Sequence, residues 1–233
     1  MSQIAEHLLQ VKERIVQAAS RAGRRGDHIQ LLAVSKTKPL EAVCEAYAAG
    51  QRRFGESYAQ EAATKIDTLR EQGTCTDIEW HFIGPLQSNK SKLVAERFDW
   101  VQSVDREKLI ERLNNQRPTG LAPLNVCLQI NISGESSKSG TSEQEIFRLA
   151  ELVSRCERLR LRGLMAIPEH TSDEAVLAAQ MVRMQTLFTE LARQYPGVDT
   201  LSMGMTEDLE LAIGHGSTMV RVGTAIFGAR DYS

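Results

Sequence analysis

Lys36 is the residue whose position first suggests covalent chemistry. It follows the apolar run 31–34 at the end of a predicted strand, and strand alternation puts its side chain on the same side as Leu32 and Val34. A lysine that is partly removed from water loses its proton more readily, and its neutral amine can then attack an aldehyde. The alternative is a solvated lysine, which is the commoner state of a lysine taken alone.

A second group of residues, near the end of the chain, has the composition of a phosphate site. Ser202 and Gly204 follow the predicted seventh strand, and Gly223 and Thr224 follow the eighth. Glycine lets backbone N–H groups approach a ligand, hydroxyls donate further hydrogen bonds, and the last two loops of a barrel often bind phosphate. Each glycine could instead serve only a tight turn. Together the amine and this cradle indicate one ligand that carries an aldehyde and a phosphate.

Two further residues are candidates on the same strands. Arg221 lies between valines in the predicted eighth strand, where a charge is unusual unless it is paired with a carboxylate or faces a functional centre. If it meets a pyridine nitrogen, that nitrogen stays unprotonated and the ring is a weak electron sink, because arginine donates but does not accept a proton. His81, near the end of the third strand, fits a hydrogen-bonded core histidine as well as a functional one.

Apolar or β-branched runs alternate with helical patterns along most of the chain. The strands are predicted at 30–35, 52–55, 79–83, 100–104, 124–131, 159–167, 199–203 and 218–222. The helices are predicted at 2–22, 40–49, 57–72, 88–97, 106–116, 142–155, 174–194 and 206–213. Helix-length connections imply parallel strand pairing, and eight such units favour closure into a (β/α)8 barrel. An open doubly wound sheet would produce the same alternation.

The domain organisation expected from this pattern is one barrel over residues 1–233, with the helix at 2–22 packed on it. Asp105, and Ser142 or Thr141, are expected N-caps. Length and composition agree with one globular α/β domain, since the chain has 233 residues and is 42% hydrophobic.

Charge and cysteine content exclude several classes of function. The formal net charge of −2 leaves no basic excess for a phosphate backbone, so nucleic acid is not expected as a partner. The four cysteines show no metal-ligand spacing, so we expect reduced thiols and no metal site. The first residues lack the pattern of a signal peptide and no segment resembles a membrane span, so we expect a cytoplasmic protein that does not bind a membrane.

Several segments resemble the YggS/PROSC family of pyridoxal phosphate homeostasis proteins, in the family's order and over nearly the whole chain. They are Ala33–Pro39 (AVSKTKP), Trp80–Lys90 (WHFIGPLQSNK), Gly163–Ile167 (GLMAI), Leu201–Met205 (LSMGM) and Val220–Gly228 (VRVGTAIFG). The undecapeptide that begins at Trp80 makes the resemblance highly specific. One segment departs from the family, because residues 54–58 read Phe-Gly-Glu-Ser-Tyr where the family usually has asparagine in place of Ser57.

The resemblance implies a fold related to the N-terminal domain of alanine racemase, with pyridoxal 5′-phosphate held as a Schiff base on Lys36. It implies that the phosphate is surrounded by Ser202, Gly204, Gly223 and Thr224, and that Arg221 meets the pyridine nitrogen. It further implies that Val34, His81 and Met165 line the ring or its mouth. A cofactor contact made by the family's asparagine is expected to be lost or bridged by water at Ser57.

Three functions compete at this point. A non-catalytic carrier or buffer of pyridoxal phosphate, with pyridoxal phosphate-dependent apoenzymes as partners and a monomeric state, is what the resemblance implies, and we favour it. A racemase-like enzyme would need a second acid or base on the opposite face of the substrate. Related racemases obtain this group from an additional domain and a dimer partner, and we expect no room for such a domain here. Tyr58 could substitute for it. A Schiff-base aldolase acting on a sugar phosphate would use the same lysine and cradle.

Overall fold

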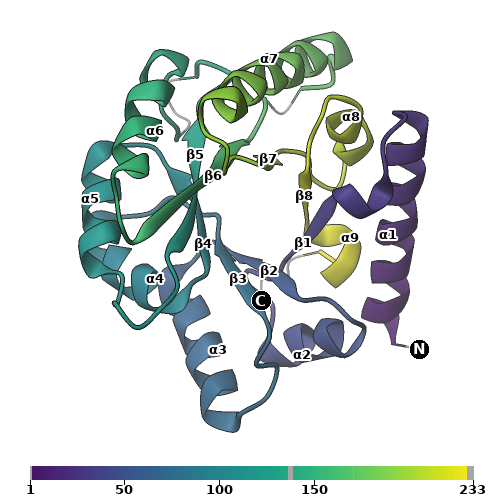
Figure 1. Ribbon diagram of the computed structural model, residues 1–233. Coiled ribbons are helices and arrows are strands. Elements are labelled where there is room, and N and C mark those ends of the chain that lie inside the picture. Colours follow the sequence, from purple (N-terminus) through teal and green to yellow (C-terminus); the bar gives the residue numbers. More distant parts are fainter. Residues whose placement is uncertain (1, 136–138, 170, 230–233) are drawn as a thin grey trace.

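The computed structural model describes residues 2–135, 139–169 and 171–229. Its centre is a closed barrel of eight parallel strands in the order β1 to β8 (Figure 1). The strands are β1 (Gln30–Val34), β2 (Arg53–Glu56), β3 (Glu79–Phe82), β4 (Trp100–Val104), β5 (Leu124–Ile130), β6 (Leu159–Ala166), β7 (Thr200–Ser202) and β8 (Met219–Val222). The prediction of a barrel rather than an open sheet is therefore confirmed.

The helices surround the strands on the outside of the barrel (Figure 1). They are α1 (Gln3–Arg21), α2 (Leu40–Ala48), α3 (Ala59–Gln72), α4 (Ser91–Arg97), α5 (Glu107–Gln116), α6 (Ile146–Ser154), α7 (Glu174–Gln194), α8 (Leu209–Gly214) and α9 (Thr224–Phe227). Short 3₁₀ turns at η1 (Gly26–His28), η2 (Ser88–Lys90) and η3 (Glu143–Glu145) precede β1, α4 and α6. Helices α6, α7 and α8 pack on neighbouring strands, whereas α1 packs mainly on other helices.

The N-terminal helix α1 packs against the last two helices of the chain. The face of α1 that carries Leu8, Val11 and Ile15 is buried, and the helix lies beside α8 and α9 (Figure 1). Arg14 forms a two-bond ion pair with Glu210 of α8, at 2.8 and 2.9 Å. These contacts join the start of the chain to its last helices.

Closure of the barrel depends on the pairing of β1 with β8. Leu32 lies opposite Arg221 and Ala33 opposite Val222 in this parallel pair. The segments that follow these two strands therefore emerge at the same end of the barrel, and the register places Lys36 near Gly223.

The N-cap predictions are only partly correct. Arg106, rather than Asp105, occupies the N-cap position of α5, and Asp105 forms an ion pair with Arg106 at 2.6 Å. Ser142 precedes η3 at the cap position but makes no capping hydrogen bond through its side chain. Asp173, by contrast, caps α7 by accepting hydrogen bonds from two backbone N–H groups.

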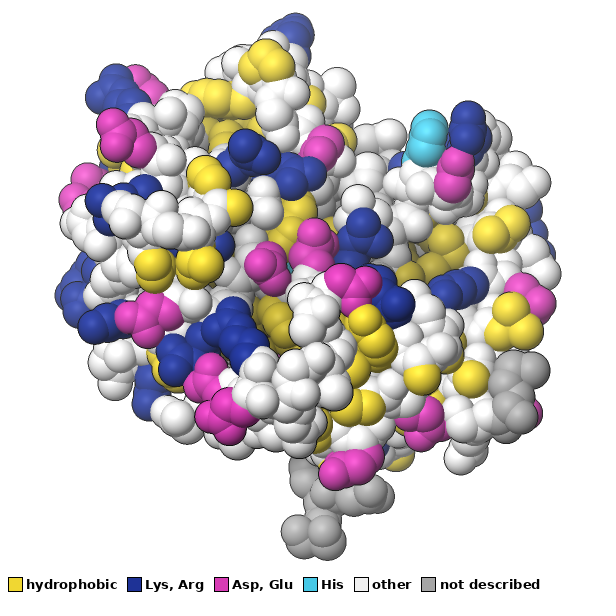
Figure 2. All heavy atoms as spheres, turned by 60° about the horizontal axis from the view of Figure 1, so that its bottom comes forward, with side chains coloured by type: hydrophobic (Ala, Val, Ile, Leu, Met, Phe, Trp, Pro, Cys, Tyr) yellow, Lys and Arg dark blue, Asp and Glu magenta, His cyan; other side chains and the backbone are white. Residues whose placement is uncertain are grey.

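The described residues contain no helix that is both long and apolar enough to cross a bilayer. Lys and Arg side chains are interspersed with Asp and Glu over the face that Figure 2 presents, and they do not gather into one basic stripe. The four cysteines are free thiols. In the described ranges no three His, Cys, Asp or Glu side chains form a group that could hold a metal ion.

Candidate functional site

A cavity of about 580 Å³ opens where the chain leaves the carboxyl ends of the strands. Six of the ten residues singled out in the sequence line it: Val34, Lys36, Ser57, Arg221, Gly223 and Thr224. They come from β1, β2, β8 and the segments directly after them. The structure thus brings the candidate amine, the strand arginine and the last-loop glycine to one cavity.

The backbone around Lys36 is held from outside the barrel by a buried charged cluster. Lys65 of α3 donates to the carbonyl oxygen of Ser35 at 3.0 Å and to Glu56 Oε1 at 2.9 Å. The Ser35 hydroxyl donates to the same Glu56 oxygen at 2.7 Å. Lys65 also donates to Glu61 at 2.6 Å, one helical turn away. Because Glu56 is fully buried and Lys65 nearly so, the cluster is shielded from water.

On the other side of Lys36, Thr37 adopts a left-handed backbone conformation with φ of +64°. Such a conformation is unfavourable for a β-branched residue and has to be held by its surroundings. The backbone N–H of Thr37 donates to Glu61 Oε1 at 2.8 Å. The cluster therefore fixes the residue before Lys36 and the residue after it.

Arg221 is buried, although it lines the cavity. It donates to Ser202 Oγ and to the carbonyl oxygen of Ala166, both at 2.9 Å. Among the described residues no carboxylate forms an ion pair with it, so the alternative of a buried ion pair is not what the structure has. Burial lowers the pKa of Arg221 to about 10, and the guanidinium still carries its charge at neutral pH.

The two predicted phosphate residues of the β7 loop lie outside the cavity lining. Ser202 is fully buried, donates to Gln102 Oε1 at 2.6 Å and accepts from Arg221. Gly204 has φ of +96°, and a side chain there would meet the Ala212 methyl group at 2.5 Å. Packing against α8 is therefore sufficient to require this glycine, as the structural alternative held.

His81 and Met165 lie in the barrel interior and do not line the cavity. Met165 packs with Trp100 and Cys127 in a small buried cluster. The His81 ring is fully buried and stacks on Trp100, with ring centres 4.9 Å apart. Both ring nitrogens are hydrogen-bonded, one to Glu79 and one to Gln102, at 2.9 Å each. The structure thus favours the core role for His81.

Several residues of the site were not singled out from the sequence. The cavity is also lined by Lys38, Ile83, Ile167, Pro168, Glu169, Thr171, Leu177, Met205, Thr206, Glu207, Asp208 and Gly228. Thr206 and Asp208 follow the β7 strand, so their place after a strand end was a usable signal. For the buried cluster of Glu56, Glu61 and Lys65, the sequence offered only a weaker signal. This signal is the spacing of Glu61 and Lys65 by one helical turn.

Ser57 lines the cavity where the chain leaves β2. A side chain at Gly84 would come within 2.2 Å of the Ser57 carbonyl oxygen. The close approach of these two backbones explains the glycine after β3 and sets where Ser57 can lie.

Comparison with known proteins gives a consistent result. Residues 7–231 match the family described as "Alanine racemase, N-terminal domain". The pyridoxal phosphate homeostasis protein of Vibrio alginolyticus is 54% identical over 233 residues, which cover all of both chains. The protein of that name from Escherichia coli is 56% identical over 233 residues, covering 100% of this chain and 99% of the other.

Solved structures agree with these relatives. PipY of Synechococcus elongatus, described with PLP bound, superposes with a TM-score of 0.80 at 36% identity, covering 97% of this chain and 100% of that chain. Alanine racemase from Streptomyces coelicolor gives a TM-score of 0.76 at 18% identity, covering 97% of this chain and 58% of that one. The second likeness concerns the fold alone.

Proposed function

Because the chain belongs to the family of the alanine racemase N-terminal domain, and within it to the pyridoxal phosphate homeostasis proteins, we propose that it binds pyridoxal 5′-phosphate as a Schiff base on Lys36 and carries or buffers this cofactor in vitamin B6 homeostasis. One observation carries the proposal: Lys36, Arg221 and Gly223–Thr224 line the same cavity.

The residues of the cavity fit the chemical groups of this cofactor. Lys36 offers an amine for the aldehyde, and its neighbours in the chain are fixed by Lys65 and Glu61. Gly223 has no side chain to cover its backbone, and Thr224 adds a hydroxyl, which suits a phosphate. When bound, pyridoxal phosphate supplies an aldehyde that takes up amines reversibly and a ring that withdraws electrons.

Arg221 supports the proposal because, within the described part of the chain, its guanidinium donates only to neutral acceptors. A guanidinium has five N–H donors, and two hydrogen bonds to Ser202 and Ala166 leave the others for the cavity side. We propose that one of them donates to the pyridine nitrogen. Arginine then keeps that nitrogen unprotonated, which weakens the electron-withdrawing power of the ring and suits retention of the cofactor better than rapid chemistry on it.

The binding residue can be tested by chemical trapping. Protein loaded with pyridoxal phosphate is reduced with sodium borohydride and digested, and the peptides are analysed by mass spectrometry. We expect a pyridoxyl adduct on the Lys36 peptide and, before reduction, a Schiff-base absorption band in the visible or near-ultraviolet region. An unmodified Lys36 in loaded, reduced protein would contradict the proposal. Protein as purified, before any cofactor is added, should also show the band, which an aldolase lysine would not give.

The carrier role is separated from a racemase role by turnover. A typical enzyme has a kcat of about 1 to 1000 per second. We expect loaded protein to racemise or decarboxylate alanine and serine far below this range and to restore activity to a pyridoxal phosphate-dependent apoenzyme. Turnover at an ordinary enzymatic rate would replace the carrier proposal with the racemase alternative.

The proposal also includes a single domain over residues 1–233, a cytoplasmic location, a monomeric state and apoenzymes as the receiving partners. Sedimentation of the loaded protein tests the monomer, with an expected mass of 25.9 kDa. Mixing with an apoenzyme behind a dialysis membrane tests whether contact is needed for transfer.

A further inference from the structure

A line of buried hydrogen bonds runs through the interior of the barrel, from the cavity to its opposite end. Arg221 Nη1 donates to Ser202 Oγ at 2.9 Å, and Ser202 Oγ donates to Gln102 Oε1 at 2.6 Å. Gln102 Nε2 and His81 Nδ1 are 2.9 Å apart, and so are His81 Nε2 and Glu79 Oε1. The five side chains come from β8, β7, β4 and β3, so no local sequence pattern connects them.

The far end of this line is a carboxylate. Burial alone would raise the pKa of Glu79, but the hydrogen bond from His81 and the charge of Arg53 lower it below its ordinary value. Arg53 Nε donates to the same Glu79 oxygen at 3.1 Å. Glu79 is therefore ionised at neutral pH, and an ionised carboxylate can only accept hydrogen bonds.

Each bond along the line then has one possible direction. His81 has to carry a proton on Nε2 in order to donate to Glu79. Burial lowers the pKa of His81, so the ring is neutral and Nδ1 accepts from Gln102. The amide nitrogen of Gln102 faces His81, so its oxygen faces Ser202. The Ser202 hydroxyl proton is committed to this oxygen, and only its lone pair is left for Arg221.

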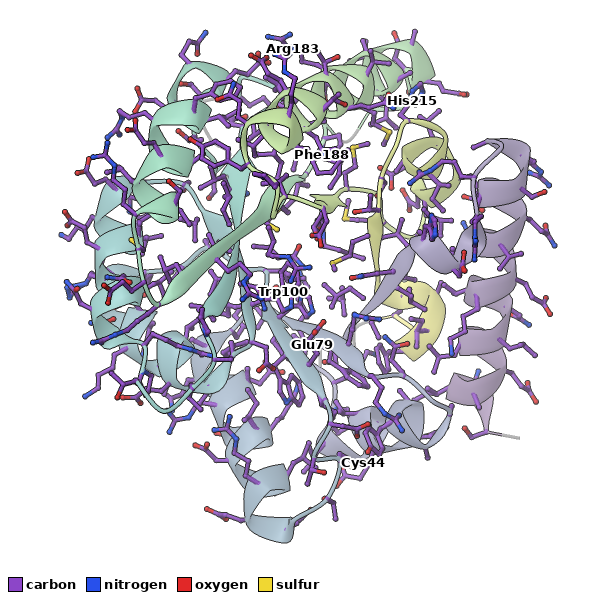
Figure 3. All side chains as sticks on the ribbon, viewed as in Figure 1. Cys44, Glu79, Trp100, Arg183, Phe188 and His215 are labelled. Carbon is purple, nitrogen blue, oxygen red and sulfur yellow. The ribbon has the colours of Figure 1, made fainter. Side chains whose placement is uncertain are left out.

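The packing around His81 keeps the ring in this orientation. The ring stacks on Trp100 with an angle of 13° between the planes. The Arg162 guanidinium lies over Trp100, 4.5 Å from the ring centre, and is paired with Asp199. Besides Glu79, the charged groups that act on His81 are Arg53 and Asp99. Figure 3 shows Glu79 and Trp100 close together near the centre of the ring of strands.

We infer that Glu79 sets the direction of this hydrogen-bonded line, and that Gln102 and Ser202 are positioning residues that hold the Arg221 guanidinium in one orientation at the cavity. In the opposite direction the Gln102 amide would be turned over and would donate to Ser202, whose hydroxyl proton would be free for another acceptor. The direction therefore decides whether the Ser202 hydroxyl proton is committed to Gln102 and only its oxygen faces Arg221. As far as it concerns the cofactor, this inference rests on the proposed function.

The tautomer of His81 tests the inference without any cofactor. Long-range ¹H–¹⁵N NMR of ligand-free protein labelled in its histidines distinguishes the protonated nitrogen, and His81→Gln identifies the signal. At pH 7 we expect a neutral ring protonated on Nε2. In Glu79→Gln, whose side chain can also donate, we expect the Nδ1–H form to become populated. Glu210→Gln, which removes another arginine-paired carboxylate, should leave the signal unchanged.

Two outcomes would overturn the inference. One is an Nδ1–H or doubly protonated His81 in the unaltered protein, which can be read even if Glu79→Gln does not fold. The other is an unchanged tautomer in a folded Glu79→Gln variant.

A second measurement connects the line to Arg221. Gln102→Leu removes the acceptor of the Ser202 proton, and we expect an affinity for pyridoxal phosphate weakened about tenfold and a shifted absorption band. Gln129→Leu, at another buried glutamine whose side chain bonds to Ser139, is the control and should change neither. Equal effects of the two variants would show that Gln102 has no positioning role. Absence of a Lys36 adduct in the unaltered protein would instead refute the proposed function and leave the tautomer result standing.

Discussion

Lys65 Nζ donates to Glu56 Oε1 at 2.9 Å, and this buried pair joins α3 to the end of β2 beside the segment that carries Lys36. Loss of one partner of a buried pair leaves the other without compensation. We therefore expect Lys65→Met to lower the free energy of unfolding by about 3–5 kcal/mol, measured by urea denaturation. Lys92→Met, which removes an exposed pair with Glu96, should cost less than about 0.5 kcal/mol. If Lys65→Met lowered the free energy of unfolding no more than Lys92→Met does, the cluster would not stabilise the fold.

Lys36→Ala should remove the covalent attachment. We expect the reduced adduct to disappear from the peptide that contains residue 36, while weak binding through the phosphate remains, and dialysis should then remove the cofactor faster. Lys38→Ala is the matched control, because Lys38 lines the same cavity two residues further along the chain and donates to the carbonyl oxygen of Ala229 at 2.6 Å. If the unaltered protein carried adduct on both lysines, and Lys38→Ala lost part of the total adduct, the attachment would be assigned to both lysines.

Arg221→Met should separate binding from stability. Since no described carboxylate pairs with Arg221, its removal leaves only neutral acceptors unpaired and relieves a buried charge. We expect the free energy of unfolding of the ligand-free protein to change by about 1 kcal/mol or less, and the affinity for pyridoxal phosphate to fall at least about tenfold. Equilibrium unfolding and absorption titration measure the two effects.

Arg117→Met provides the comparison for this variant. Arg117 is also buried, but it donates to the carbonyl oxygens of Ala95, Phe98 and Ala122 and does not line the cavity. We expect it to lose more stability than Arg221→Met and to bind the cofactor with unchanged affinity. The reverse pattern would remove Arg221 from the site.

Stability should fall in mild acid because of His81. Burial lowers the pKa of His81 below the ordinary value of 6.5, so the unfolded chain takes up a proton at a pH where the folded chain does not. Stability is therefore full above pH 6.5 and is lost as the pH falls, by up to about 1.4 kcal/mol per pH unit for one proton. Urea midpoints measured from pH 7 to pH 5 should show this slope, and His81→Gln should reduce it.

Two further side chains bear on the loss of stability in acid. His28→Gln, the same substitution at an exposed histidine, is the control for His81→Gln. The pKa of Glu79, held at about 2, adds a further loss only as the pH falls from 4.5 towards 2. A slope between pH 7 and pH 5 that survives His81→Gln would contradict the assignment.

The barrel could be predicted because each of its eight strand–helix units leaves a local signal of apolar period and length. The cavity position of Lys36 followed from strand alternation and its place at a strand end, and that of Val34 from the family resemblance. The interior line from Arg221 to Glu79 could not be predicted, because it joins side chains of β8, β7, β4 and β3 whose contact depends on the stagger of the closed sheet. For the same reason Ser202 was expected at the phosphate, although its hydroxyl bonds inside the barrel.

The glycines show the same limit on a smaller scale. Gly204 and Gly223 look alike in the sequence, each directly after a short apolar strand. Only the packing distinguishes them, because a side chain at Gly204 would strike Ala212 while Gly223 lines the cavity. Such a distinction requires knowing which helix covers which loop.

The pairing of β1 with β8 has a consequence for the order of events during synthesis. Residues 30–33 pair with residues 219–222. A nascent chain that lacks β8 therefore carries Lys36 but not the Gly223–Thr224 segment that lines the cavity with it. The cavity can exist only after the ribosome has released nearly all of the polypeptide. A molecule with a complete cavity is therefore one in which β8 has paired with β1 and closed the ring of strands.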